Sequence, residues 1–426
     1  MIRETKTYIL QLMSGILMLL LTLTSCSTDD DSQSNNPVLK IYVYSPDHPI
    51  VTRVDNPDPD VNPIAAESAI NTLQVWVFEH HEPSDQDSER DGKFVGYIST
   101  NGNDISSETN QGTLVMNITD PYFIQNRPNV DVYVAANVKN ANCGFTLSEN
   151  STRANLIAAK IGDSKFGVKS VSAVVKAVPD DGLPMSGVLI NQPISGTAPI
   201  FGVGTEGNLA KVKLVRAVSK MRFVFCCIDD DVTHKVKSIS LDGTKIYKSE
   251  YLFLDDEYLP TGGPGYRYKV DDDISKPFVG GTPTIMNTQT TIHPMTSTDK
   301  DPSFYDWTNQ TGQYQTGQAY ETLIAENLIR IVDGVKVGDL NDLGTYYLHE
   351  SDKQVEGTIT YLDNSDEKTA TFKISNQLEF LPGDFGRNHT WIVYAYFNYA
   401  KGLEVVTVKV NDWETTDPEE YEVYNW

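Results

Sequence analysis

Two short segments contain residue types that commonly ligate metal ions in proteins, but the spacing of these residues does not suit a metal site. His80–Glu82 is a consecutive His-His-Glu, and adjacent side chains of an extended chain point to opposite faces. Asp58, Asp60 and Asn62 alternate like calcium ligands, but prolines 57, 59 and 63 interrupt the segment and it lacks the glycine of a calcium loop. We interpret the first as a hydrophilic loop and the second as a rigid acidic linker, with fortuitous calcium binding as the alternative. We expect no metal and no cofactor.

A glycine-rich string, Gly202–Gly207 (GVGTEG), has the spacing of a dinucleotide-binding loop. That function requires a helix directly after the loop, whose N-terminus meets the pyrophosphate. The residues after Asn208 alternate like a strand instead, so we interpret the string as a turn between domains. The sequence contains no G-x-S-x-G nucleophile elbow, and no pair of carboxylates stands out. These patterns indicate a protein that is not an enzyme.

The chain has 4 cysteines, and three of them lie far from the N-terminus. Cys226 and Cys227 are neighbours in a predicted strand, where their side chains face opposite sides and a mutual disulfide would be strained. Pairing of one of them with Cys143 is an open alternative. The sequence does not decide the disulfide state of these three residues.

The remaining cysteine, Cys26, follows an N-terminal export signal. Basic residues precede the apolar run Tyr8–Leu23, which as a helix would rise about 24 Å, less than the roughly 30 Å hydrocarbon core of a bilayer. This pattern is typical of a secretory signal peptide. Its end, Leu23–Cys26 (LTSC), resembles the lipobox of bacterial lipoproteins, in which the cysteine becomes the lipidated first residue. An ordinary cleaved signal is the alternative.

The residues after Cys26 indicate where the protein is displayed. Ser27–Asn36 contains no apolar residue and reads as a solvated tether. Its run of aspartates resembles the surface-export signal of lipoproteins in the Bacteroides group, with a periplasm-facing lipoprotein as the alternative. The whole chain has 426 residues and a formal net charge of −24. Such an acidic surface repels phosphate backbones, so we expect no nucleic-acid partner.

Short strand-like runs, separated by Gly, Asn, Asp and Pro, recur along the chain without long amphipathic helices. This pattern favours β-sandwiches over alternating βαβ units. The predicted strands are Leu39–Tyr44, Leu73–Phe78, Phe94–Ile98, Thr113–Ile118, Val130–Ala135, Lys211–Phe225, Val236–Leu241, Glu356–Tyr361, Ala370–Ile374, Trp391–Phe397 and Leu403–Val410. Short helices are predicted at Pro63–Ala69 and Thr152–Lys160.

Several segments together resemble the FimA/Mfa family of fimbrial subunits from Bacteroidales, over nearly all of the chain that follows the signal. Each motif alone is weak, and the resemblance rests on their order and spacing. They are the lipobox, Ala69–Phe78 (AINTLQVWVF), Val130–Asn137 (VDVYVAAN), Leu183–Gly187 (LPMSG), Val212–Met221, Ile324–Asn327 (IAEN), Arg387–His389 (RNH) and Val408–Trp413 (VKVNDW).

The resemblance implies an all-β fold with two tandem transthyretin-like β-sandwich domains and a polymerising, non-enzymatic role. It also implies that a trypsin-like protease cuts the lipidated precursor after an arginine, which we assign to Arg53, so that the mature subunit begins at Val54. A surface arginine without this role is the alternative. The expected parts are the signal peptide 1–25, a lipidated tether with the first strand 26–53, an N-terminal domain 54–207 and a C-terminal domain 208–426.

The first strand and the C-terminal tail are the segments that such an assembly would exchange. Leu39, Ile41 and Val43 alternate towards one face of the first strand, and their removal would leave an apolar groove with unpaired edges. The aromatic C-terminus is our candidate donor, with packing of the tail on its own domain as the alternative. The donor residues would be Tyr421, Val423, Tyr424 and Trp426.

The expected function is therefore a structural subunit of a cell-surface fimbria that supports adhesion. Its partners would be other fimbrial subunits, the maturation protease, a host glycan or protein ligand and, before processing, the outer membrane through the lipid. A fimbrial tip or anchor subunit and a glycan-binding surface lipoprotein are the alternatives. The precursor would lie at the outer membrane, and the processed subunit in an extracellular fimbria.

Overall fold

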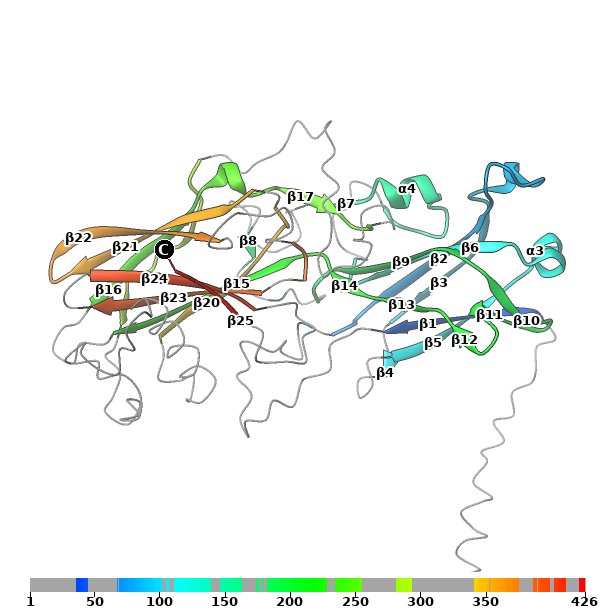
Figure 1. Ribbon diagram of the computed structural model, residues 1–426, viewed down its shortest axis with the longest axis horizontal. Helices are drawn as coiled ribbons and strands as arrows, with labels where there is room; N and C mark the ends of the chain where they lie inside the picture. Colours follow the sequence, from blue (N-terminus) through cyan, green and yellow to red (C-terminus); the bar gives the residue numbers. More distant parts are fainter. Residues whose placement is uncertain are drawn as a thin grey trace, which may run out of the picture.

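The described strands of the computed structural model form an elongated molecule, with the N-terminal strands at one end and the C-terminal strands at the other (Figure 1). The structure describes residues 36–44, 67, 69–101, 105–106, 111–138, 146–162, 174–175, 178, 182–227, 234–254, 281–292, 341–351, 353–374, 386–388, 390–398, 402–410 and 421–425. The expected all-β fold class is confirmed, and its strands form two sandwiches. Within these ranges no helix is long and apolar enough to cross a membrane.

The N-terminal sandwich packs a seven-stranded sheet against a five-stranded sheet. The first contains β1 (Val38–Tyr44), β4 (Ile105–Ser106), β5 (Gln111–Asn117), β10 (Ile194–Thr197), β11 (Ile200–Thr205), β12 (Asn208–Leu209) and β13 (Lys211–Lys213). The second contains β2 (Leu73–His80), β3 (Phe94–Thr100), β6 (Asn129–Ala136), β9 (Met185–Gln192) and β14 (Val215–Arg216).

Strand β2 is buried on both of its faces, which explains its nearly continuous apolar sequence. Leu73, Val75 and Val77 lie in the core between the two sheets. Trp76 and Phe78 point to the opposite face and pack in a separate cluster under the segment that contains α4 (Arg153–Ile157). Because successive side chains of a strand alternate, such a run is typical of a strand covered on both sides.

The C-terminal sandwich packs a six-stranded sheet against a five-stranded one around a core that includes Trp391 and Phe223. The six-stranded sheet contains β8 (Val174–Val175), β15 (Ser219–Cys227), β20 (Asn341–Leu348), β23 (Thr390–Asn398), β24 (Gly402–Val410) and β25 (Tyr421–Asn425). Its partner contains β16 (His234–Leu241), β18 (Thr284–Met286), β19 (Thr290–Ile292), β21 (Val355–Asp363) and β22 (Asp366–Ile374).

Two predicted elements differ from the structure. The predicted strand Lys211–Phe225 is wrong as one element, because the chain changes sheets and forms β13, β14 and β15 in turn. Between them, the Leu214 amide donates to the Tyr44 carbonyl at 2.9 Å and the Ala217 amide donates to the Pro184 carbonyl at 2.8 Å. The predicted helix Thr152–Lys160 is shortened to α4, because Lys160 already belongs to β7 (Lys160–Gly162).

Strands from the two halves of the chain also pair with each other. Strand β7 pairs with β17 (Ser249–Tyr251) in a separate two-stranded sheet, and β8 pairs with β20.

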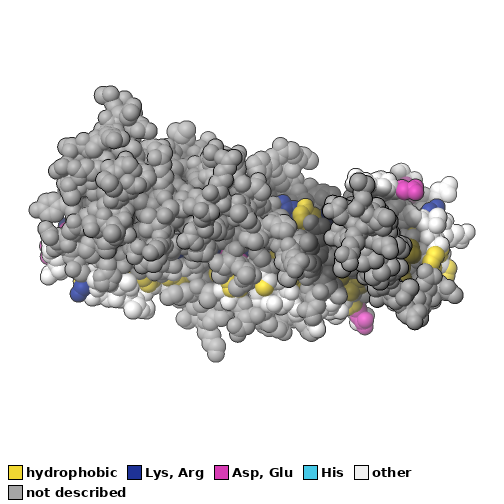
Figure 2. Space-filling model, turned by 90° about the horizontal axis from the view of Figure 1, so that it is seen from below, with side chains coloured by type: hydrophobic (Ala, Val, Ile, Leu, Met, Phe, Trp, Pro, Cys, Tyr) yellow, Lys and Arg dark blue, Asp and Glu magenta, His cyan; other side chains and the backbone are white. Residues whose placement is uncertain are grey.

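Some hydrophobic side chains reach the surface on the face seen from below Figure 1 (Figure 2). Val115 and Ile200, on the outer face of the β1 sheet, are about half exposed, at 54% and 48%.

Candidate functional site

Strand β1 is an interior strand, although it lies close to the N-terminus of the chain. It pairs with β5 in antiparallel orientation along its whole length, from Val38 to Tyr44. On its other edge it runs parallel to β11 and then to β13. At its two ends, the Val38 amide donates to the Pro199 carbonyl at 2.8 Å, and the Tyr44 carbonyl accepts from Leu214. Both edges of β1 are therefore closed by backbone pairing.

The inward side chains of β1 are part of the sandwich core. Leu39 and Ile41 are 0% exposed and Val43 is 1% exposed, and all three belong to the cluster between the two sheets. The outward-facing residues of the strand are partly exposed. At typical values, burial of three aliphatic side chains contributes about 5–9 kcal/mol before opposing terms are counted.

A chain without β1 would contain a long groove in place of this strand. The floor of the groove would consist of the apolar core side chains that now pack against the inward face of β1. Each wall would be a neighbouring strand whose backbone amide and carbonyl groups had lost their partners. Such an edge binds another extended segment by strand addition. The buried side chains contributed by the neighbouring strands are Leu114, Met116, Phe201, Val203 and Val212.

The C-terminal strand β25 has a different position from β1. Among the described residues it pairs only with β24, in antiparallel register from Val406↔Asn425 to Val410↔Tyr421, and forms the edge of its sheet. Tyr421, Val423 and Tyr424 lie in this strand, while Trp426 lies outside the described residues. An edge strand shares one ladder of backbone hydrogen bonds, so its departure leaves the rest of its sheet paired.

Some residues singled out from the sequence lie outside the described part of the chain. They are Cys26, Arg53, Val54, Cys143, the acidic segment Asp58–Asn62, most of the predicted helix Pro63–Ala69 and the IAEN motif Ile324–Asn327. Cys226 and Cys227 end β15, in register with Tyr396 and Phe397 of β23.

The histidine pair contacts separate acidic groups. His80 Nδ1 lies 2.8 Å from Asp131 Oδ1, whereas His81 Nε2 lies 3.1 Å from Glu79 Oε2. Among the described residues, no group of three or more His, Cys, Asp or Glu side chains could hold a metal ion.

The glycine string 202–207 forms part of β11 and its turn into β12. Gly204 pairs with Leu209, and Thr205 pairs with Asn208. The interpretation as a turn between domains is wrong, because this hairpin lies within the N-terminal sandwich beside β1. Gly204 has a φ of 111°, and a Cβ there would come within 2.3 Å of the Ala210 amide nitrogen. Close backbone approach therefore accounts for this glycine.

A buried polar layer between the two sandwiches was not predicted from the sequence. Glu67 is 1% exposed, and its carboxylate lies 2.9 Å from Lys220 Nζ and accepts a hydrogen bond from the Tyr347 hydroxyl. Its carbonyl accepts from Arg216 Nε at 3.0 Å. Burial, and then the nearby Glu67 carboxylate, raise the pKa of the Tyr347 hydroxyl. Glu67 is thus fixed at the junction, fourteen positions beyond Arg53.

A second buried group surrounds Arg387, from the RNH motif. Its Nη2 lies 2.6 Å from Glu350 Oε1, and its Nη1 donates to the Leu252 carbonyl at 3.0 Å. Nearby, His349 Nδ1 lies 2.8 Å from Glu250 Oε1, and burial raises the pKa of the Glu250 carboxyl. Arg387 and Glu350 are 37 positions apart, and no local pattern in the sequence indicates that they meet.

Comparisons with known proteins give one family match and a set of distant structures. Residues 50–219 match the family model described as "Major fimbrial subunit protein (FimA)". A search of curated proteins finds no match.

Two of the similar solved structures are fimbrial proteins. A fimbrial assembly protein from Parabacteroides distasonis is 12% identical, with a TM-score of 0.41 over 92% of this chain and 99% of that one. The fimbrial anchor protein Mfa2 from Porphyromonas gingivalis is 9% identical, with a TM-score of 0.33 over 91% of this chain and 98% of that one.

Proposed function

With the resemblance to the FimA/Mfa-type fimbrial family confirmed through residues 50–219, we propose that this chain is a structural subunit of a cell-surface fimbria. The subunit is exported as a lipoprotein on Cys26, cleaved after Arg53 and polymerised by strand exchange. The observation that supports this proposal most directly is the position of β1, an interior strand that precedes the cleavage residue in the sequence.

The proposed switch depends on the covalent link between β1 and the remainder of the chain. While the link is intact, β1 is held near its own groove at a high effective concentration, and a strand from another subunit cannot compete with it. Cleavage after Arg53 cuts this link, so a strand that leaves the groove is diluted. The lipid on Cys26 departs with β1, since both lie before the cut.

The residues that follow the cut stay attached to the folded subunit in this scheme. Glu67 is held by Lys220, Tyr347 and Arg216 at the junction, and β2 begins at Leu73. Loss of β1 therefore removes one strand from the first sheet and leaves the second sheet, which includes β2, intact. The C-terminal tail of another subunit then fills the groove.

Substitution of Arg53 tests the proposal. The Arg53→Ala variant should remain a membrane-bound lipoprotein and form no polymer, because a trypsin-like protease requires a basic residue at the cut. Arg53→Lys is the matched control and should be processed and polymerise. Mass spectrometry of sheared filaments should find Val54 as the first residue of subunits from wild-type cells.

The result has two clear outcomes. If Arg53→Ala forms polymer ladders like those of the wild type, or if filament subunits begin at Cys26, then Arg53 is not the switch. If Arg53→Lys polymerises and Arg53→Ala does not, the basic residue is required at this position.

A further inference from the structure

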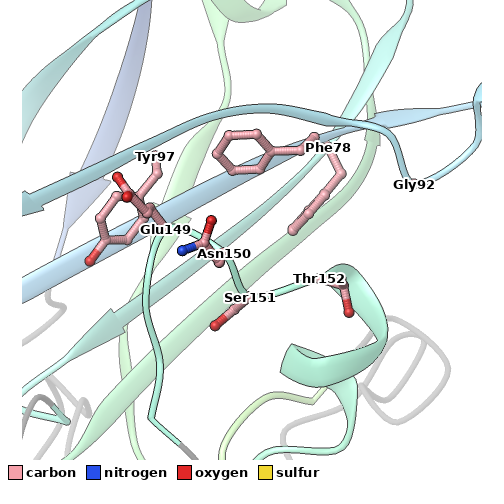
Figure 3. Close-up of a pocket in the computed structure, with 8 residues that line it drawn as sticks. Phe78, Gly92, Tyr97, Glu149, Asn150, Ser151 and Thr152 are labelled. Carbon is pink, nitrogen blue, oxygen red and sulfur yellow. The ribbon is translucent and has the colours of Figure 1, made fainter.

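A pocket lies on the outer side of the second N-terminal sheet, away from the β1 groove. It has a volume of about 510 Å³ and lies between β2, β3 and the loop that leads into α4 (Figure 3). This size falls in the range of about 300–1,000 Å³ that is typical of small-molecule sites. Its lining residues are Phe78, Gly92, Phe94, Tyr97, Glu149, Asn150, Ser151 and Thr152.

Aromatic rings from the two strands form one wall of the pocket. Phe94 is 43% exposed, and its ring lies 6.0 Å from that of buried Phe78. Tyr97 lies 5.4 Å from the ring of Trp76, and its hydroxyl accepts from Gln74 Nε2 at 2.7 Å. Buried neighbours thus hold these rings in place, so little conformational entropy is lost when a ligand stacks on them.

The opposite wall is polar and comes from the loop Glu149–Thr152, which faces Phe78 and Tyr97 (Figure 3). Glu149 and Asn150 are exposed. The loop is fixed by its backbone, since the Ser148 carbonyl accepts from Trp76 Nε1 at 2.7 Å and the Ser148 amide donates to Ser151 Oγ at 3.0 Å. The capping box of α4 begins at the last residue of this loop, Thr152.

The charges around the pocket disfavour an anionic ligand. Glu149 carries the only acidic or basic side chain among the eight lining residues. The guanidinium of Arg153, next in sequence, is paired with Asp91 and with Asp131, the latter at 2.7 Å. A purely apolar ligand would cover Glu149 and Asn150 without replacing their hydrogen bonds to water, which costs free energy.

We propose that this pocket binds a neutral saccharide of one or two rings, within a longer glycan. The C–H face of a sugar ring lies against Phe94 and Tyr97, and its hydroxyl groups donate to the Glu149 carboxylate and bond with the Asn150 amide. The site is independent of strand exchange, because its residues lie on the face of the second sheet that is turned away from β1. Filaments of such subunits would present one site per subunit.

Binding by the full chain to an array of neutral and sialylated oligosaccharides tests this assignment. A neutral structure should bind, and titration with its terminal disaccharide should show saturation transfer in NMR to the C–H protons of the ring. Phe94→Ala and Glu149→Ala should each weaken binding at least 10-fold. Val115→Ala and Glu206→Ala alter an exposed apolar and an exposed acidic side chain elsewhere and should bind like the wild type.

Thermal unfolding of each variant separates loss of the site from loss of the fold, since Phe94 and Glu149 are exposed and their substitution should leave Tm nearly unchanged. The assignment is overturned if no neutral saccharide binds or if sialylated structures bind better than their neutral counterparts. It is also overturned if Phe94→Ala and Glu149→Ala, both folded, bind as tightly as the wild type. Polymer formation by these variants is measured separately. It tests the strand-exchange proposal and not the saccharide site.

Discussion

A buried carboxylate near the end of β2 pairs with an arginine of the segment that connects β2 to β3. Glu79 is 0% exposed, and Arg90 donates to it through Nε at 2.7 Å. The same guanidinium reaches Asp120 at 2.9 Å and lies 3.6 Å from the centre of the Tyr122 ring. Since a buried charge without a partner is strongly destabilising, Arg90 explains why Glu79 is tolerated in this strand.

Asp120 gives a prediction about pH. It caps α3 (Pro121–Asn126) by accepting from the Tyr122 amide. The hydrogen bond from Lys93, opposed by burial and reinforced by the Tyr122 amide and by Arg90, lowers the pKa of the Asp120 carboxyl to about 2. A lowered folded-state pKa stabilises the fold above the ordinary value of 3.8, and this contribution is lost as pH falls towards about 2.

We therefore expect Asp120→Asn to lower the free energy of unfolding by about 1 kcal/mol at pH 7, because asparagine keeps the cap but loses the charge. The difference from the wild type should shrink between about pH 4 and pH 2. Urea denaturation across this range measures it, with Glu367→Gln on an exposed ion pair as control. A difference that does not change with pH would contradict the assigned pKa.

At the scale of elements, β1 and β25 differ in how strongly each is held. β1 has neighbours on both edges and three side chains in the core, whereas β25 pairs only with β24 in the part of the chain that the structure describes. A strand at an edge leaves its sheet at lower cost than an interior strand. This difference supports the proposal that β25 is the donor strand and that the groove vacated by β1 is the acceptor.

Deletion of Tyr421–Trp426 is the prediction at this scale. The shortened chain should remain a folded monomer, because β24 keeps its pairing with β23, and it should form no polymer. Replacement of the six residues by a Gly-Ser segment of equal length should have the same effect, which separates the side chains from chain length. Denaturing gels of filaments give the measurement, and unchanged polymer ladders would exclude the tail as donor.

At the scale of the whole molecule, the two sandwiches share a polar junction as well as strand pairs. Arg387 connects Glu350 with the backbone that follows β17, and β17 pairs with β7 of the N-terminal half. Arg216 donates to Asn388 Oδ1 at 3.0 Å across the same junction. Because these groups are buried and satisfy each other in one geometry, they fix how the two halves pack.

We expect Arg387→Ala to lower the free energy of unfolding by about 3–5 kcal/mol, since it leaves Glu350 buried without its cation. Lys368→Ala, which removes a half-exposed partner of Asp363, should change it far less, because exposed ion pairs contribute little to stability. Urea denaturation provides both values. Equal effects of the two substitutions would show that the buried pair does not hold the junction.

The sequence predicted most of the strands because alternation and β-branched or aromatic residues report local burial. The apolar face of β1 and the buried run of β2 lie where their periodicity indicated. Where the chain changes sheets at 211–219, the same composition continues while the backbone partners change, so periodicity could not locate the breaks. The GVGTEG segment was wrongly assigned to the domain boundary for a similar reason, because the sequence of a turn does not show which sheet its flanking strands belong to.

The sequence by itself determined the all-β class, which the structure confirms, and it predicted the export signal with its cysteine and the switch residues, which stay predictions. All of these depend on local order and spacing. Only the tertiary structure placed β1 in the interior of its sheet and β25 at an edge, and only it brought Glu67 to Lys220 and Arg387 to Glu350. The pocket beside Phe94 likewise forms only when the chain adopts its tertiary structure. Strand neighbours, buried ion pairs and pocket walls join residues that are remote in the chain, and no local pattern encodes which of them will meet.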